Sequence, residues 1–220
     1  MGASLWVGAN SHFLNLDTSL NFFLTVALCA FVLAQQEDAR PAEIRRRMWL
    51  AWAAMAAATL SKGLIGLLIP AGTLFCYSLF CWEWRAWRRM HWLSGSVIFL
   101  ALSAPWFWLV SQQNPEFARF FFIHEHFDRF LTNTHGREAP FWIFVPILLV
   151  GFLPWTSHLP RLLVTSLRRS AGEGFQTERF LMIWALFVFA FFSKSHSKLP
   201  SYILPMFPAL ALLLGQSLAD

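Results

Sequence analysis

Charged residues are scarce in this chain of 220 residues. Asp, Glu, Lys and Arg together make up 13% of it, whereas hydrophobic residues make up 57%. A soluble domain of this length would normally carry about 25% charged residues. The scarcity therefore excludes an ordinary soluble domain and indicates an all-α protein that crosses a membrane several times.

Tyrosine and cysteine are also rare. Two Tyr stand against 12 Trp and 24 Phe, the aromatic excess expected of belts at membrane interfaces. The three cysteines lie in or beside apolar segments without the spacing of metal ligands, so we expect small buried hydrophobes. The chain also lacks internal repeats, low-complexity tracts and the positive first region of a signal peptide.

The net charge of +5 raises the alternative of a nucleic-acid-binding protein. Eleven of the 17 Lys and Arg residues, however, fall in the short segments 40–47, 85–89 and 161–179. Short basic loops between apolar spans follow the positive-inside rule, which favours a membrane protein without a nucleic-acid partner.

Seven apolar segments predict about seven membrane segments. They run at 17–34, 48–60, 64–81, 93–110, 141–159, 180–193 and 201–217. Basic loops at both outer ends of the second and third segments predict a hairpin with Lys62 at its tip, on the outer side. Alternation of the other spans places Asp17, residues 111–140 and residues 193–200 on that side too. Ionisable groups at one face, rather than near the bilayer midplane, favour an interfacial enzyme over a transporter.

Asp17 and Lys62 each leave two interpretations open. Asp17 opens a helix, where an acid caps free amides, but its carboxylate is also suited to an outer cavity. Lys62 is either a lysine that snorkels to the interface or an ammonium that binds a phosphate near helix ends.

The outer loop 111–140 combines ionisable and aromatic residues. The spacing of its phenylalanines predicts an amphipathic helix in the membrane plane, with its charges either solvated or part of a site. His124, Glu125 and His126 do not have the H-E-x-x-H spacing of a zinc helix. A metal would need one of these histidines together with ligands from elsewhere.

The loop 193–200 carries Lys194, His196 and Lys198 among serines. Lysines on an outer loop run against the positive-inside rule, so they need a local reason. Paired lysines with hydroxyls suit an anionic head group such as phosphate, and the alternative is a short hairpin with solvated lysines.

Motifs across the chain resemble those of bacterial lipid A aminoarabinose transferases and, more broadly, the protein O-mannosyltransferase-like membrane glycosyltransferases of the GT-C fold. The matching segments, in order along the chain, are Leu16–Leu20, Leu60–Gly63, Ser103–Trp106, Phe122–Phe130, Pro146–Trp155 and Ser193–Pro205. The resemblance implies part of a GT-C transmembrane domain over residues 1–220.

Such enzymes transfer a sugar from a polyprenyl-phosphate donor to an acceptor at the outer face of the bacterial inner membrane, toward the periplasm. The resemblance implies 4-amino-4-deoxy-L-arabinose as the sugar and lipid A as the acceptor, with other sugars and lipid or glycolipid acceptors left open. It implies these roles: Asp17 as an acidic catalytic residue, Lys62, Arg129, Lys194 and Lys198 on the donor phosphate, and His124, Glu125 or His126 on a divalent metal ion.

The family's full chains begin with further spans and an outer loop carrying an acidic pair, from which the catalytic base is usually drawn. Only about sixteen residues precede Asp17, and the chain stops at Asp220, just after a span. We therefore expect a fragment that lacks the first spans and the C-terminal domain. An inactive fragment and a transporter-like protein for an anionic lipid-linked substrate are the alternative readings.

Overall fold

The computed structural model describes residues 4–6, 8, 16–114, 116–117, 139–168, 174–195 and 197–219. Within these ranges the structure is helical. The main helices are α2 (Leu16–Ala34), α3 (Pro41–Lys62), α4 (Ile65–Cys81), α5 (Arg85–Arg88), α6 (Trp92–Gln113), α9 (Phe144–Gly151), α10 (Leu159–Arg168), α11 (Thr177–Lys194) and α12 (Met206–Ala219), with short 3-10 helices η2 (Trp155–His158) and η3 (Pro200–Ile203). The predicted all-α membrane fold is confirmed.

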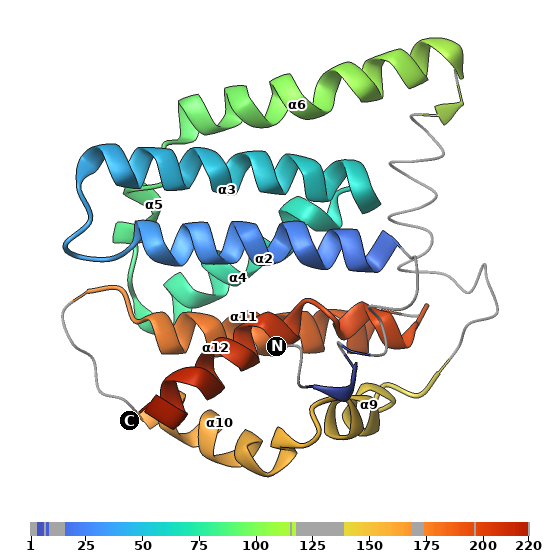
Figure 1. Cartoon of the computed structure of the whole chain (residues 1–220). Helices are drawn as coiled ribbons and strands as arrows, with labels where there is room; N and C mark the ends of the chain where they lie inside the picture. The colour runs from blue at the N-terminus through green and yellow to red at the C-terminus, as the bar shows by residue number, and fades with distance from the viewer. Residues whose placement is uncertain are drawn as a thin grey trace.

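The long helices α6, α3, α2 and α11 lie in a row, and α4 and α12 cross it at an angle (Figure 1). α2 packs against α3, α3 against α4 and α6, and α11 against α4 and α12. α3 is rich in alanine at its buried positions, including Ala51, Ala54 and Ala58. Small residues let helix backbones approach closely, which is how helices in a membrane gain packing energy.

The predicted hairpin with Lys62 at its tip is confirmed. α3 ends at Lys62 and α4 begins at Ile65, so the turn is only two residues long. Gly63 has a φ of 86°, a conformation that only glycine adopts without strain. The sequence Lys62-Gly63 therefore both ends α3 and leaves the ammonium at the tip.

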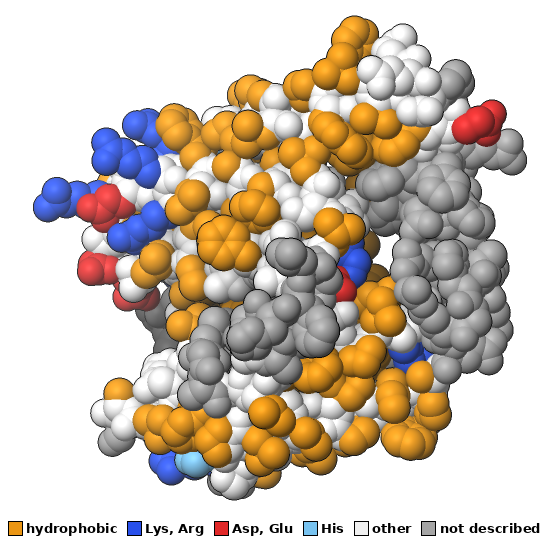
Figure 2. Space-filling view, turned by 45° about the vertical axis from the view of Figure 1, so that its right-hand side comes forward, with side chains coloured by type: hydrophobic (Ala, Val, Ile, Leu, Met, Phe, Trp, Pro, Cys, Tyr) orange, Lys and Arg blue, Asp and Glu red, His pale blue; other side chains and the backbone are white. Residues whose placement is uncertain are grey.

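The arginines gather at the opposite end of the bundle. There α2 ends, α3 begins and α5 lies, and Figure 2 shows Lys, Arg, Asp and Glu side chains clustered at one end of a largely hydrophobic surface. Arg47 donates to the carbonyl of Leu33 at 2.6 Å, and Arg89 donates to the carbonyl of Gln36 at 2.9 Å. These arginines satisfy backbone carbonyls at and just beyond the end of α2, so part of the basic cluster is structural.

In the part of the chain that the structure describes, two helices, α2 and α6, are long and apolar enough to cross a membrane, and the bent pair α9 and α10 makes a third if it counts as one span. The segment predicted as a span at 141–159 is bent in the structure. α9 ends at Gly151, and a bend of 111° separates it from the following helix. Pro154 and Pro160 lie in this stretch, and proline lacks the N–H that a continuous helix needs.

Candidate functional site

Asp17 and Lys62 meet because α2 and α3 are antiparallel neighbours. Asp17 lies in the first turn of α2, and Lys62 is the last residue of α3, so the two ends coincide. The Lys62 ammonium forms an ion pair with the Asp17 carboxylate through Oδ1. Only 8% of Asp17 is exposed. Its carboxylate therefore bonds across the bundle, while the residue also lies in the first turn of α2.

Ser201 and Tyr202, on η3, contact the same pair. Ser201 donates a hydrogen bond from Oγ to Oδ2 of Asp17 at 2.5 Å. The Lys62 ammonium lies 4.4 Å from the centre of the Tyr202 ring, within the range of a cation–π interaction. Phe192 of α11 packs against Tyr202, with their ring centres 5.1 Å apart. Three segments distant in sequence thus converge on one ion pair.

The surroundings stabilise both charges of the pair. A carboxylate that accepts from an ammonium and a hydroxyl is satisfied in its charged form, and the aromatic ring favours the cation. Removing one partner of a buried pair leaves the other charge uncompensated, which costs about 3–5 kcal/mol. The ammonium is therefore held in one place, which is what a site for a small anion requires.

The described residues of the loop 193–200, which we call the lysine loop, are 193–195 and 197–200, and they lie at the same end of the bundle. Lys198 donates to the carbonyl of Ser195 at 2.5 Å, and Ser195 donates from its hydroxyl to the carbonyl of Ser197 at 3.1 Å. Lys194, the last residue of α11, is exposed, whereas Lys198 is half-buried. Among the described residues, the hydroxyls of Ser193 and Ser197 are buried without a hydrogen-bond partner. The loop thus adds two cations and two unsatisfied hydroxyls beside Ser201.

Sequence reasoning brought Asp17, Lys62 and the lysine loop to one surface, and the structure places them there. Sequence reasoning did not assign Ser201 and Tyr202 to the site, although these two residues directly follow the lysine loop. The signal was available: a hydroxyl and one of only two tyrosines in the chain stand next to paired lysines. What was missing was the position of η3 relative to the start of α2.

The predicted residues His124, Glu125, His126 and Arg129 lie outside the described residues, as does the amphipathic helix predicted for the outer loop. In the described ranges, no three His, Cys, Asp or Glu side chains come together in a way that could hold a metal ion. The metal assignment therefore stays a prediction.

Replacing Ser201 with alanine tests the second contact of Asp17. We expect a loss of stability of about 1.5–3 kcal/mol, because the variant removes a hydrogen bond to a charged group. Thermal unfolding of the purified protein measures it, with Ser96→Ala as the control. The Ser96 hydroxyl bonds only a carbonyl of its own helix, that of Trp92, and is exposed. Equal effects of the two substitutions would contradict a role for Ser201 in holding Asp17.

A bundle of apolar helices with arginines at one end, and a buried ion pair beside a lysine loop at the other, defines a multi-pass membrane protein with a candidate anion site. A model of the dolichyl-phosphate-mannose-protein mannosyltransferase family matches residues 5–121. The chain belongs to this family, and the predicted resemblance is confirmed.

Comparison with individual relatives and solved structures shows which members of the family the chain is similar to. The chain is 33% and 35% identical over 97% of its length to undecaprenyl phosphate-alpha-4-amino-4-deoxy-L-arabinose arabinosyl transferases of Pseudomonas paraeruginosa and Pseudomonas aeruginosa. The crystal structure of ArnT from Cupriavidus metallidurans bound to undecaprenyl phosphate superposes with a TM-score of 0.92 at 40% identity, over 100% of this chain and 39% of that one. The apo structure gives 0.89. The chain spans 38% of the length of those two Pseudomonas relatives.

Proposed function

We propose that this site binds the phosphate of a polyprenyl-phosphate sugar donor in an enzyme that transfers 4-amino-4-deoxy-L-arabinose to lipid A or a similar acceptor. The observation that carries the proposal is the Lys62 ammonium, fixed by Asp17 and Tyr202 at the end of the bundle where the lysine loop lies. The names of the relatives and the undecaprenyl phosphate bound to the similar ArnT structure support the choice of donor.

The chemistry needs positive charge at this place. Transfer breaks the bond between the anomeric carbon of the sugar and a phosphate oxygen, and negative charge builds on the departing polyprenyl phosphate. A fixed ammonium in a partly desolvated site stabilises that charge, because it needs little reorganisation during the reaction. Lys62 supplies this group, and Lys194, Lys198 and Arg129 are the further cations that we assign to the phosphate.

A glycosyltransferase fits the distribution of charge better than a transporter does. α6 and α12 contain no charged residue, and the only one in α2 is Asp17, in its first turn. Charges along a translocation path would instead lie near the middle of the bilayer.

We assign Asp17 to the site as an acidic residue whose contacts serve mainly to position Lys62. A carboxylate that already accepts from Lys62 and Ser201 is a poor proton acceptor, because protonation would cost both charge-assisted bonds. The predicted role of Asp17 as an acidic catalytic residue implies a different result when its charge is removed, so an experiment can separate the two roles.

Replacing Asp17 with asparagine separates them. Asparagine keeps one of the two oxygen acceptors, places an amide NH₂ where the other was, and removes the charge. We therefore expect KM for the donor to rise about tenfold while the pH dependence of kcat is retained. Loss of one limb of the pH profile, together with a fall of about 10²–10⁴-fold in kcat, would instead assign general acid or base catalysis to Asp17.

We assign a divalent metal ion, if the reaction uses one, to His124, Glu125 or His126. A histidine and a carboxylate are suitable ligands for such an ion, and one beside the phosphate would add to the positive charge.

The site faces the periplasm in our proposal, with the protein in the bacterial inner membrane. The arginines at the start of α3 and in α5 lie at the opposite end from Lys62 (Figure 1). Basic residues mark the cytoplasmic side of spans, so the Lys62 end lies outside.

Binding of undecaprenyl phosphate to the purified protein tests the proposal directly. We expect the ligand to raise the unfolding temperature of the wild-type protein, because a ligand that binds only the folded state stabilises it. Undecaprenol, which has the same chain without the phosphate, should raise it less. Equal shifts with both ligands would contradict recognition of the phosphate.

A further inference from the structure

An apolar cavity lies between α2, α3, α4, α11 and the turn from α5 to α6. Its empty space, including the part open to the outside, measures about 560 Å³. Its lining carries no charged residue: Ala27, Leu28, Phe31, Met48, Ala51, Trp52, Met55, Leu67, Pro70, Ala71, Leu74, Trp87, Met90, Trp92, Phe180 and Trp184.

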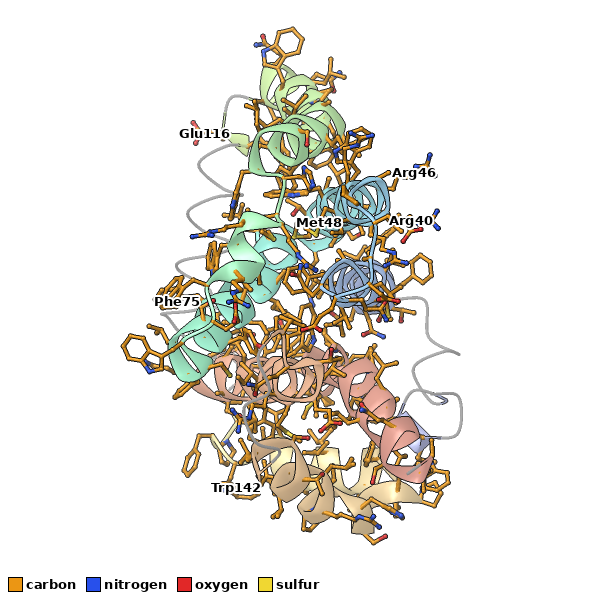
Figure 3. All side chains as sticks on the ribbon, turned by 90° about the vertical axis from the view of Figure 1, so that its left-hand side faces the viewer. Arg40, Arg46, Met48, Phe75, Glu116 and Trp142 are labelled. Atoms are coloured by element: carbon orange, nitrogen blue, oxygen red, sulfur yellow. The ribbon has the colours of Figure 1, made fainter. Side chains whose placement is uncertain are left out.

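The cavity extends from near the arginines into the middle of the bundle: on α4 its lining begins at Leu67, five residues after Lys62. On α3 its lining runs from Met48, which directly follows Arg47, to Met55. In Figure 3 Met48 lies on the inner side of α3, whereas Arg40 and Arg46 extend away from it. At about 1.5 Å per residue, the lining reaches about 10 Å below the arginines. The hydrocarbon core of a bilayer is about 30 Å thick, so each leaflet contributes about half of that depth. The cavity therefore lies at the level of the acyl chains of one leaflet.

The mouth of the cavity opens toward lipid between α4 and α6. Ala71 of α4 is exposed although it lines the cavity, and Trp92, at the start of α6, is 46% exposed. Both helices pack against α3. The outward face of α6 carries Leu93 at 85% exposure, an apolar surface suited to contact with lipid. An acyl chain can therefore enter from the side without crossing a polar surface.

The tryptophans at the mouth are fixed before any ligand arrives. Trp87 and Trp92 stack with ring centres 5.6 Å apart, and Trp52 meets Trp92 edge to face at 5.6 Å. Trp87 donates to the Ser78 hydroxyl at 2.6 Å, and Trp52 donates to the carbonyl of Met90 at 2.9 Å. The mouth is thus preformed, which lowers the entropic cost of binding.

We propose that this cavity holds one acyl chain of an anionic phospholipid from the leaflet at the arginine end, with its head group on Arg85 and Arg88. Both arginines are exposed, and they flank Trp87 on α5. A chain gains little by leaving lipid for an apolar pocket, since lipid tails are as apolar as leucine. Selectivity therefore comes from the charge of the head group. This site is separate from the Lys62 site, which lies at the other end of the bundle.

Native mass spectrometry of the detergent-purified protein, with phosphatidylglycerol or phosphatidylcholine added back, tests the proposal. We expect one phosphatidylglycerol to bind more tightly than phosphatidylcholine, and Arg85→Gln and Arg88→Gln each to weaken it about fivefold. Ala71→Trp should close the mouth and abolish this binding. Leu68→Trp is the matched control, because Leu68 lies one turn away on α4, is 43% exposed and does not line the cavity.

Ala51→Phe provides a second variant that fills the cavity from α3, and it should abolish the same binding in protein that remains folded by circular dichroism. Equal affinity for both lipids would overturn the proposal, and so would retention of phosphatidylglycerol by the Ala71→Trp and Ala51→Phe variants. Displacement of the bound phosphatidylglycerol by undecaprenyl phosphate would also overturn it, because the cavity would then belong to the donor.

Discussion

Replacing Lys62 with methionine should reduce sugar transfer by about 10²–10³-fold, the loss expected when one fixed group that stabilises developing charge is removed. Methionine preserves most of the volume and the apolar stem, so the main change is the lost ammonium. Transfer assays on membranes containing the protein, with a synthetic polyprenyl-phosphate donor, measure the effect. A variant that turns over at the wild-type rate would exclude Lys62 from the donor phosphate.

The same substitution leaves the Asp17 carboxylate buried and unpaired, so a loss of activity alone is ambiguous. The double variant Lys62→Met with Asp17→Asn removes both charges. Its unfolding temperature should therefore return most of the way from that of the Lys62→Met variant to that of the wild-type protein. It should not recover transfer. Arg46→Gln is the matched control for charge, because Arg46 is exposed at the opposite end of the bundle. Recovery of transfer by the double variant would show that Lys62 has only a structural role.

Replacing Gly66 with alanine should destabilise the protein by about 1–3 kcal/mol, the usual cost of overpacking. A Cβ at Gly66 would lie 2.5 Å from the backbone nitrogen of Thr59 and 2.7 Å from the carbonyl carbon of Ala58. Backbone atoms cannot turn aside as a side chain can, so α4 must move away from α3. Since Lys62 lies at the turn between these helices, transfer should fall as well.

Gly215→Ala is the matched control for that variant. Gly215 also lies in a helix, but a Cβ there would have no atom within 4 Å. Alanine favours a helix over glycine by about 1 kcal/mol, so this variant should be neutral or slightly more stable. Thermal unfolding and transfer assays compare the two. Similar behaviour of the two variants would show that α3 and α4 do not need their close approach at Gly66.

Much of the fold could be predicted because hydropathy and the spacing of charges act locally. The apolar segments coincide with the helices α2, α3, α4, α6, α11 and α12. The hairpin at Lys62 followed from basic loops on both sides of a continuous apolar stretch. The segment 141–159 could not be predicted as well, because its mean hydropathy suits a span whether the helix is straight or bent. Its 111° bend depends on how α9 and α10 pack.

The sequence predicted which side of the membrane the site residues share, but it did not predict which of their side chains contact one another. Topology placed Asp17, Lys62 and the lysine loop on one side, since alternating spans leave no other arrangement. No local pattern paired Asp17 with Ser201, which lie 184 positions apart. Nor did the sequence distinguish a helix-capping carboxylate from one that bonds across the bundle.

The sequence by itself determined that this protein is helical and resides in a membrane, which end carries the arginines, and which family it resembles. These properties follow from composition and from motifs that are contiguous in the chain. Only the tertiary structure decided that Asp17, Lys62, Ser201 and Tyr202 form one cluster. It also decided that α2, α3, α4 and α11 leave an apolar cavity between them, which extends toward the arginines. The reason is physical: ion pairs and cavities depend on distances between segments, and those distances are set by helix packing.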